Sequence, residues 1–241
     1  MAELNIGTAG WSIPRQYADR FPAKGTSLER YSARFRAVEI NSSFHRPHRA
    51  ATWERWRDSV PDHFRFSVKL PKEITHQRKL VDIADPLDTF AEQVRLLGEK
   101  LSVLLVQLPP KLEFDAEIAV DFFDALASRS SARIACEPRN ASWFAPAADA
   151  LLAGREVARV AADPALCPDA AVPGGWAGFA YWRLHGSPAM YRSAYGDRVA
   201  DYAHALSAAV DAGRDAWCIF DNTASSAAMG DALALLGQLS S

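Results

Sequence analysis

The sequence predicts an α/β fold, a (β/α)8 TIM barrel formed as a single domain by residues 1–241. Eight runs of residues alternate as strands do, helical patterns separate most of them, and 241 residues is a common length for single-domain barrels. Between Asp163 and Gly178, prolines and glycines take the place of a helix, so an irregular connection is expected between the sixth and seventh strands. An open, doubly wound sheet is the alternative fold.

Local signals define the expected elements. The predicted strands cover residues 4–8, 37–41, 64–69, 102–107, 132–137, 157–163, 179–185 and 216–221, and alanine-rich helices are expected over residues 197–212 and 223–236. Thr26 and Glu29 form a capping box at the start of a helix. Asp85 is predicted to cap another helix that has Pro86 in its first turn. Asp115 is expected to cap a third helix, whose apolar residues repeat at core spacing.

Composition and charge narrow the class of protein. Hydrophobic residues make up 49% and charged residues 23% of the chain, as in a soluble globular protein with a substantial core. The formal net charge of −2 argues against a membrane surface and against a nucleic-acid partner, without excluding a local basic patch. The start of the chain lacks a signal-peptide pattern, and no apolar run approaches the ~20 residues of a membrane span. The three cysteines lack metal-ligand spacing, so we expect a cytoplasmic protein with reduced thiols. The sequence specifies no oligomeric state.

Several predicted strands end in charged residues on one face. In residues 64–69 the phenylalanines and Val68 share one face, and Arg65, Ser67 and Lys69 share the other. In a barrel the apolar face meets the helices, the other face lines the interior, and active sites lie at the carboxyl ends of the strands. The polar residues expected to point inward near those ends are Lys69, Glu39, Asn41, Gln107, Glu137, Asp163, Arg183 and His185. In the last strand either Asp221 or Asn222 points inward. Such charges form either a functional site or a structural lattice of ion pairs, because an unpaired ionised group in the interior costs several kcal/mol.

Motifs along the whole chain resemble one known family. They are Gly7-Thr8-Ala9-Gly10-Trp11; Val38-Glu39-Ile40-Asn41-Ser42-Ser43-Phe44-His45-Arg46-Pro47; Phe66-Ser67-Val68-Lys69 with Thr75-His76; Gln107-Leu108-Pro109-Pro110; Glu137-Pro138-Arg139-Asn140-Ala141-Ser142-Trp143; Arg183-Leu184-His185-Gly186 with Tyr191 and Tyr195; and Phe220-Asp221-Asn222. In order and spacing they resemble the YecE-like family, a domain of unknown function. The resemblance implies a TIM barrel and no established activity. The sequence departs from the family at His45, where tyrosine is usual, and at Asp221, where a second asparagine is usual.

The inward residues carry chemistry that fits an active site. Glu137 and His185 are predicted to exchange protons, with Glu39 in the same catalytic set. Lys69 is predicted either to form a Schiff base with a carbonyl substrate or to hold an anionic group, and a structural salt bridge is the alternative. Substrate contacts are expected from Arg183, Arg139, Asn41, Gln107, Trp11, His76, Tyr191, Tyr195, Asp163 and Asn222. Aromatic rings suit stacking on a planar or sugar ring, and the loop from Gly186 to Gly196 is a candidate lid.

These residues lead to one main hypothesis of function and two alternatives. The main hypothesis is a metal-independent enzyme, without a cofactor, that acts on a small polar anionic substrate containing a ring, such as a sugar phosphate or a nucleotide. The first alternative is a metal-dependent phosphoesterase or sugar isomerase of the endonuclease-like barrel type, with ligands from Glu39, Glu137, Asp163, Asp221 and His185. Against that alternative, the cations of Lys69, Arg139 and Arg183 nearly balance the carboxylates. The second alternative is a non-catalytic binder of a nucleotide or RNA.

Overall fold

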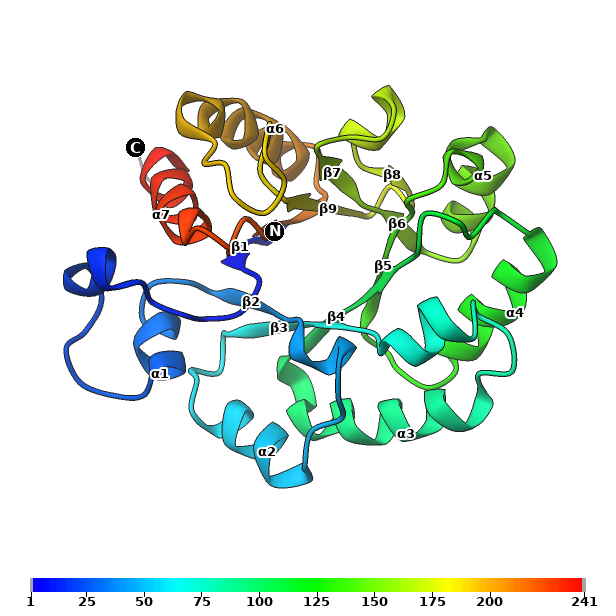
Figure 1. The fold of residues 1–241 in the computed structure, drawn as a ribbon, viewed down its shortest axis with the longest axis horizontal. Helices are drawn as coiled ribbons and strands as arrows, with labels where there is room; N and C mark the ends of the chain where they lie inside the picture. Colours follow the sequence, from blue (N-terminus) through cyan, green and yellow to red (C-terminus); the bar gives the residue numbers. More distant parts are fainter. Residues whose placement is uncertain (1, 240–241) are drawn as a thin grey trace.

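The protein, seen in a computed structural model that describes residues 2–239, has an α/β fold with mostly parallel sheets. The strands in this range are β1 Leu4–Thr8, β2 Ala37–Ile40, β3 Arg65–Lys69, β4 Leu101–Gln107, β5 Arg133–Glu137, β6 Val157–Arg159, β7 Ala161–Asp163, β8 Gly174–Gly175, β9 Phe179–Leu184 and β10 Asp215–Phe220. The α-helices are α1 Ser27–Ser32, α2 Ala50–Asp58, α3 Ala84–Val94, α4 Ala116–Ala127, α5 Pro146–Gly154, α6 Val199–Asp211 and α7 Ala227–Leu239. Figure 1 shows the helices on the outside of the strands. Within residues 2–239, no helix is long and apolar enough to cross a membrane.

The strands form two sheets, with the orders β1-β10-β9-β7 and β2-β3-β4-β5-β6-β8. Neighbouring strands run parallel, except for the antiparallel pair of β6 and β8. The sheets approach each other at two places. At one, Ala9 and Glu39 form a parallel bridge, and the Gly10 amide donates to the Glu39 carbonyl at 2.8 Å. At the other, β6 pairs with β5, and β7, which begins one residue beyond Val160, pairs with β9. The single strand predicted over residues 157–163 is therefore divided, because its two halves join different sheets.

The close approach of β1 and β2 depends on a glycine and a tyrosine. A Cβ atom on Gly7 would lie 2.2 Å from the carbonyl oxygen of Ala37, so this position has no room for a side chain. The Tyr31 hydroxyl, carried by α1, accepts a hydrogen bond from the Thr8 amide at 2.8 Å and donates to the Ala37 carbonyl at 3.0 Å. The side chain of Tyr31 thus connects the neighbouring edges of the two sheets.

Alternation along the strands separates two apolar cores. One face of each sheet packs against the helices, as Leu104 and Val106 of β4 do in a cluster that includes Phe122 and Leu206. The opposite faces of the two sheets meet in a second cluster of Ala37, Val103, Leu105, Ala135, Ala158, Val160, Phe179, Tyr181, Trp217 and Ile219. The two-residue period of a strand carries this inner face onward, from Ala37 to Glu39, from Ala135 to Glu137 and from Tyr181 to Arg183. The inner core therefore ends in charged residues at the carboxyl ends of the strands.

The helix starts test the predicted caps. The capping box of Thr26 and Glu29 is confirmed, because both of its hydrogen bonds are present. The Asp115 cap is also confirmed, since its carboxylate accepts from the amides of Glu117 and Ile118 at 3.0 and 3.1 Å. The Asp85 cap is wrong: α3 begins at Ala84, which places Asp85 in the first turn, where a carboxylate still favours the positive end of the helix dipole.

The two alanine-rich helices begin later than predicted. A single 3-10 turn, η7 Gly196–Arg198, precedes α6. The last helix, α7, begins at Ala227 rather than near residue 223, and Ser226 before it has a φ of 65°. That left-handed conformation is incompatible with a helix running through Ser226. Between β7 and β9, where an irregular connection was expected, the chain forms the 3-10 turn η6 Pro168–Ala171 and the two-residue strand β8.

Candidate functional site

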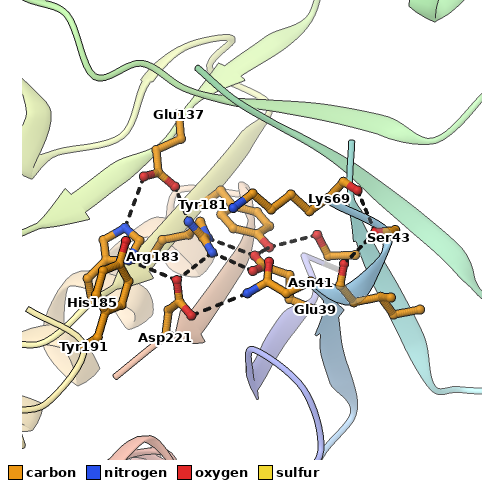
Figure 2. A network of polar contacts seen from close by, with 12 residues as sticks. Glu39, Asn41, Ser43, Lys69, Glu137, Tyr181, Arg183, His185, Tyr191 and Asp221 are labelled. Atoms are coloured by element: carbon orange, nitrogen blue, oxygen red, sulfur yellow. Dashed lines mark hydrogen bonds and ion pairs between the residues drawn. The ribbon is translucent and has the colours of Figure 1, made fainter. Parts of the chain in front are cut away.

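The Arg183 guanidinium lies at the centre of a buried charge cluster (Figure 2). Its Nε and Nη2 atoms donate to the two carboxylate oxygens of Glu39 at 2.9 and 2.7 Å. Nη2 also donates to Asp221 Oδ2 at 2.9 Å, and Nη1 donates to Glu137 Oε2. These three carboxylates come from the ends of β2, β5 and β10, so one side chain of β9 joins both sheets. A fully buried guanidinium requires such partners, because an uncompensated charge in the interior costs several kcal/mol.

His185, directly after β9, lies between two of these carboxylates. Its Nδ1 atom is 3.1 Å from Asp221 Oδ2, and its Nε2 atom is 3.1 Å from Glu137 Oε1. A carboxylate only accepts, so both ring nitrogens must carry protons for both contacts to be hydrogen bonds. Burial alone would lower the pKa of His185, but Glu137 and Asp221 raise it above the usual 6.5. The geometry therefore favours a fixed imidazolium at position 185 over the proton exchange expected from the sequence.

Glu137 has no carboxylate oxygen without a donor. Besides His185, its Oε1 atom accepts from Arg139 Nε at 3.1 Å and from Arg139 Nη2 at 2.9 Å. Burial would raise the pKa of Glu137, but Arg183, then His185 and Arg139, hold it well below the usual 4.5. A buried carboxylate with so low a pKa is a poor proton acceptor. The structure thus gives Glu137 the properties of a charge partner, contrary to its predicted role in proton exchange.

Glu39 is held in a similar way from below. Both of its oxygens bind Arg183, and the Tyr181 hydroxyl is 3.1 Å from Glu39 Oε2 and 2.9 Å from Ser67 Oγ. A phenol has one hydrogen, so when Tyr181 donates to Glu39, Ser67 donates to Tyr181. Glu39, Ser67 and Tyr181 are all fully buried. Glu39 is therefore fixed beneath the other charges, out of direct reach of a ligand.

Lys69 differs from the rest of the cluster. Three carboxylates, from Glu39, Glu137 and Asp221, are balanced by Arg183, Arg139 and the imidazolium of His185 without Lys69. Among the described residues, no hydrogen bond or ion pair reaches the Lys69 ammonium, and its Nζ atom lies 4.1 Å from the centroid of the Phe44 ring. Figure 2 shows this side chain extending from β3 toward Arg183.

The surroundings of Lys69 favour its neutral form. Burial, and next the positive charge of Arg183, lower the pKa of Lys69 from 10.5 to about 8, although Glu39, Glu137 and Asp221 oppose this effect. The backbone of Lys69 is fixed by Ser43, whose hydroxyl is 2.7 Å from the Lys69 carbonyl oxygen. Phe44, in the 3-10 turn η2 Ser42–Phe44 after β2, also contacts the rings of His45 and His76 edge-on. The chain therefore presents an amine with a reduced pKa on a rigid support.

Three predicted site residues contact α6, α7 or the segment before α6 instead of the cluster, and the first is Asp163. Its Oδ2 atom accepts from Tyr202 Oη at 2.6 Å and from Arg198, both near or on α6. In the pairing of β7 with β9, Ala162 is opposite Arg183 and Asp163 is opposite Leu184. Leu184 packs in the core under the helices, so Asp163 shares that outward face. The predicted inward direction of Asp163 is wrong.

Tyr195 and Asn222 are the other two. Tyr195 is 4% exposed, and its hydroxyl accepts from the Gly186 amide at 2.9 Å and contacts the Asp163 carbonyl oxygen at 3.2 Å. Asn222 is fully buried, and its Nδ2 atom donates to the Ser193 carbonyl at 2.9 Å and to Asp231 Oδ2 at 2.7 Å. Both side chains thus hold the loop of residues 186–196 in place and do not face the cluster. Asp221, not Asn222, supplies the carboxylate of the last strand.

Two further predicted residues cover the cluster from above. The Tyr191 ring stands edge-on to the His185 ring, with centroids 5.6 Å apart, and Tyr191 is partly exposed to solvent. Arg139 Nη2 donates to the Tyr191 hydroxyl at 3.3 Å. Tyr191 thus lies where a loop would close over a ligand, and a lid made by residues 186–196 stays a prediction.

The remaining predicted contacts are Asn41, Gln107, His76 and Trp11, of which Asn41 contacts the cluster. Asn41 Nδ2 donates to Asp221 Oδ1 at 3.5 Å, while its Oδ1 atom is buried without a partner among the described residues. Gln107 is 7% exposed. Burial, then the charges of Lys69, Lys72 and Arg139, lower the pKa of His76. Trp11 packs edge-on against Trp56 at 5.1 Å, as part of the core rim.

Three residues of this region were absent from the predicted site: Phe44, Ser67 and Tyr181. For Ser67 and Tyr181 a signal existed, because the alternation that indicated Lys69 and Arg183 also places them on the inner face. Asp221 was one of two adjacent polar candidates. Phe44 lies in a short turn, for which alternation gives no direction.

A cavity of ≈ 360 Å³ opens beside the cluster. Glu137, Arg139 and His185 form its charged part, and its apolar walls include Phe144, Val160, Ala162, Leu166 and Met190. Leu166 and Met190 are 55% and 42% exposed at its rim. Its volume is within the range of small-molecule sites. The cavity suits a ligand with one anionic and one apolar or ring-shaped part.

The carboxylates that a metal site would need surround the Arg183 guanidinium instead of an open position. Within residues 2–239, no group of three or more His, Cys, Asp and Glu side chains is arranged to hold a metal ion. Asp163 points toward α6, and Arg183 occupies the space between the carboxylates of Glu39, Glu137 and Asp221. The residues of the metal-dependent alternative therefore do not fit a metal ion as they stand.

Curated relatives match part of the chain. UPF0759 protein YunF of Bacillus subtilis is 31% identical over 152 residues, which cover 59% of this chain and 53% of that protein. UPF0759 protein YecE of Escherichia coli is 32% identical over 106 residues, which cover 44% of this chain and 38% of that protein. The chain thus spans about half the length, or less, of these curated relatives in the aligned regions.

Solved structures share the fold over the whole chain. A DUF72 family protein from Enterococcus faecalis has a TM-score of 0.82 and 20% identity, covering 99% of this chain and 96% of that chain. One from Thermotoga maritima has a TM-score of 0.79 and 21% identity, covering 99% and 100%. A sugar phosphate isomerase/epimerase from Parabacteroides distasonis has a TM-score of 0.56 and 12% identity, covering 99% and 96%. The sequence profile described as "Protein of unknown function DUF72" matches residues 5–241. The chain therefore belongs to the DUF72 family.

Proposed function

We propose that this protein is a metal-independent enzyme that binds a small anionic substrate next to the charge cluster. In this proposal the Lys69 side chain contacts the reacting atoms of the substrate. The observation that carries the proposal is that the Lys69 ammonium forms no hydrogen bond or ion pair with any residue in the range 2–239. Every nearby carboxylate is already bound by Arg183, Arg139 or His185, and Lys69 lies against the Phe44 ring instead. Burying a lysine without a partner lowers stability, and such costs are typical of functional sites.

The charge balance supports an anionic ligand. With Lys69 protonated, the cluster carries one positive charge more than its three carboxylates compensate, and Arg139 lies 24% exposed on the cavity side. Phosphate and carboxylate groups are the usual partners of arginine and lysine at such sites. The adjoining apolar walls would hold a ring or carbon skeleton. Sugar phosphates and nucleotides combine both features.

The cluster residues then take different roles from those expected at first. Arg183 and His185 would act as fixed positive charges, and Glu39, Glu137 and Asp221 would hold them in place. Such a floor is oriented before the ligand arrives, so it does not need to reorganise during a reaction. Sugar phosphates deserve the first test, because the Parabacteroides distasonis protein of similar fold is named for an activity on them.

We also propose that the two sheets close into one (β/α)8 barrel and form a single domain. On one side, the bridge of Ala9 and Glu39 and the Tyr31 hydroxyl link β1 to β2. On the other, β6 and β7 are consecutive and pair with neighbours in different sheets. Closure would place all the charged strand ends at one end of the barrel, around a common opening. A crystal structure in which β1 and β2 separate beyond hydrogen-bonding distance at Gly10 would contradict it.

Binding and variants test the enzyme proposal together. A thermal-shift screen of sugar phosphates, nucleotides and inorganic phosphate should raise the melting temperature of the wild type and of Arg155→Gln, a remote surface variant whose partner is Asp124. Lys69→Met and Arg139→Gln should remain folded and lose most of the shift. Equal shifts in all four proteins would remove the cluster from ligand binding. Activity that requires an added divalent metal ion would instead support the metal-dependent alternative.

A further inference from the structure

We propose that Lys69 is a nucleophile that forms a covalent imine with an aldehyde or ketone substrate. This inference rests on the proposed function and narrows its substrate class to carbonyl compounds that carry an anionic group. Among the cations of the cluster, Lys69 is the amine that can become a neutral nucleophile at moderate pH: a guanidinium does not deprotonate in proteins, and both ring nitrogens of His185 are held by carboxylates.

The first support is the way in which the cluster keeps carboxylates away from the amine. Glu39, Glu137 and Asp221 are near enough to influence Lys69 electrostatically, yet none forms an ion pair with it. Arg183 binds all three of them. Arg139 also binds Glu137, and His185 also contacts Glu137 and Asp221. An ion pair would keep the ammonium protonated, so this pairing pattern preserves the nucleophilic form of Lys69.

The second support is the surface on which the amine rests. The Phe44 ring lies 4.1 Å from Nζ and offers no hydrogen-bond acceptor in place of water. Ser43, the residue before it, fixes the Lys69 carbonyl at 2.7 Å. Burial next to Arg183 brings the pKa of Lys69 to about 8. A desolvated lysine beside another cation is the arrangement that activates an amine for imine formation.

The reaction balances without any further reagent. The neutral Nζ atom attacks the carbonyl carbon, a C–N bond forms, and a proton passes from nitrogen to oxygen to give a carbinolamine. The C–O bond then breaks, and the oxygen leaves as water with both hydrogens of the amine, so that an imine remains. One proton from solvent converts the imine to an iminium ion. Its positive charge faces the carboxylates of Glu39, Glu137 and Asp221, which already favour a cation at this position.

Reductive trapping tests the inference. The wild type is incubated at pH 8 with dihydroxyacetone phosphate, and in parallel with uncharged dihydroxyacetone, and then treated with sodium borohydride. Borohydride reduces an imine to a stable secondary amine, which intact-mass measurement and peptide mapping locate. The matched control is Lys72→Met, which removes an exposed lysine from the loop that follows β3. Circular dichroism and melting temperature verify that each variant is folded.

We expect one adduct on the peptide that contains Lys69, with the phosphate compound labelling faster than dihydroxyacetone. At pH 8 roughly half of an amine with pKa near 8 is neutral, against about one in 300 at the usual 10.5. The labelling rate of Lys69 should therefore exceed that of the exposed Lys72 by at least ~10-fold, even though a less basic amine is a weaker nucleophile. Lys72→Met should label like the wild type, and Lys69→Met and Lys69→Arg should not give this adduct.

The possible failures separate the two proposals. Labelling spread over exposed lysines, or unchanged in Lys69→Met, overturns the imine. If anionic ligands raise the melting temperature through Lys69 but neither carbonyl probe is trapped there, the imine fails and the proposed function stands. If neither binding nor trapping depends on Lys69, both proposals fail.

Discussion

Replacing Lys69 with methionine should stabilise the protein near neutral pH, and the gain should disappear as the pH rises. The pKa of Lys69 is about 8 in the folded protein, against a usual value of 10.5. Between these values the folded state binds fewer protons than the unfolded state, so the free energy of unfolding of the wild type rises with pH there. Below pH 8 the whole cost of the buried charge is present, and above 10.5 it is gone.

The size of the effect follows from the same pKa values. The difference between 10.5 and about 8 corresponds to at most ~3.4 kcal/mol, and partial exposure of the side chain reduces this to ~1–3 kcal/mol. Methionine keeps an apolar contact with Phe44, whose cation–π interaction with Lys69 contributes only ~0.5–1 kcal/mol. At pH 7 we therefore expect Lys69→Met to exceed the wild type by ~1–2 kcal/mol in the free energy of unfolding.

Denaturant unfolding at pH 7, 8, 9 and 10 measures this difference, with Lys72→Met as the control that should run parallel to the wild type. Groups shared by both proteins cancel in the comparison, so the remaining pH dependence belongs to Lys69. A variant that is less stable than the wild type by ~3–5 kcal/mol, with no trend between pH 8 and 10, would show that Lys69 is one partner of a structural ion pair. That result would refute the description of its charge as uncompensated.

Three further predictions concern other groups. Arg183→Met leaves three buried carboxylates without their main partner, so its free energy of unfolding in denaturant should fall by ~3–5 kcal/mol. The control Arg129→Met, which removes a surface pair with Asp88, should lose less than ~1 kcal/mol. Equal losses would contradict the central role of Arg183. Because the pKa of His185 is raised, its protonation stabilises the fold fully below pH 6.5, and this stabilisation is lost as the pH rises through the pKa of His185 in the folded protein. NMR titration should find His185 still protonated above pH 6.5, and its pKa should be lower in Asp221→Asn. Burial raises the thiol pKa of Cys136 and Cys218, so Ellman's reagent should modify half-buried Cys167 in the native protein and the other two only after denaturation; fast native modification of all three would argue against the buried positions.

The strand alternation indicated where the cluster lies, because side-chain direction in a strand has a fixed period of two. The pattern was clear where one face was apolar and large, as around Arg183, and it placed Glu39, Lys69 and Glu137 correctly on the inner side. It failed for Asp163, because residues 157–163, apart from Arg159 and Asp163 itself, are apolar on both faces. It also left Asp221 and Asn222 undecided, since β10 ends at Phe220 and two polar residues follow.

The roles within the cluster were beyond what the sequence could indicate. A pKa depends on which charges touch, and those contacts join residues far apart in the chain, such as Arg183 and Glu39 across 144 positions. Glu137 and His185 were predicted to exchange protons on the basis of residue type alone. Their mutual contact, and their contacts with Arg183, Arg139 and Asp221, favour the charged forms of both groups, and their part in proton exchange stays a prediction. Sequence periodicity gives direction, but charge pairing needs the fold.

Asp221 and Asn222 are consecutive residues whose side chains lie on opposite sides of the backbone. They therefore connect the charge cluster with the loop of residues 186–196. Asp221 holds Arg183 and His185, while Asn222 holds the Ser193 carbonyl of the loop that carries Tyr191. We expect that a displacement of that loop, transmitted through Asn222, would turn the same peptide unit and draw the Asp221 carboxylate away from its cations. The positive potential at Lys69 would then rise, because Asp221 favours the charged amine, and the amine would release its proton more readily. Movement of the loop and the protonation of an amine on the far side of the cluster would thus be linked through a single turn of the main chain.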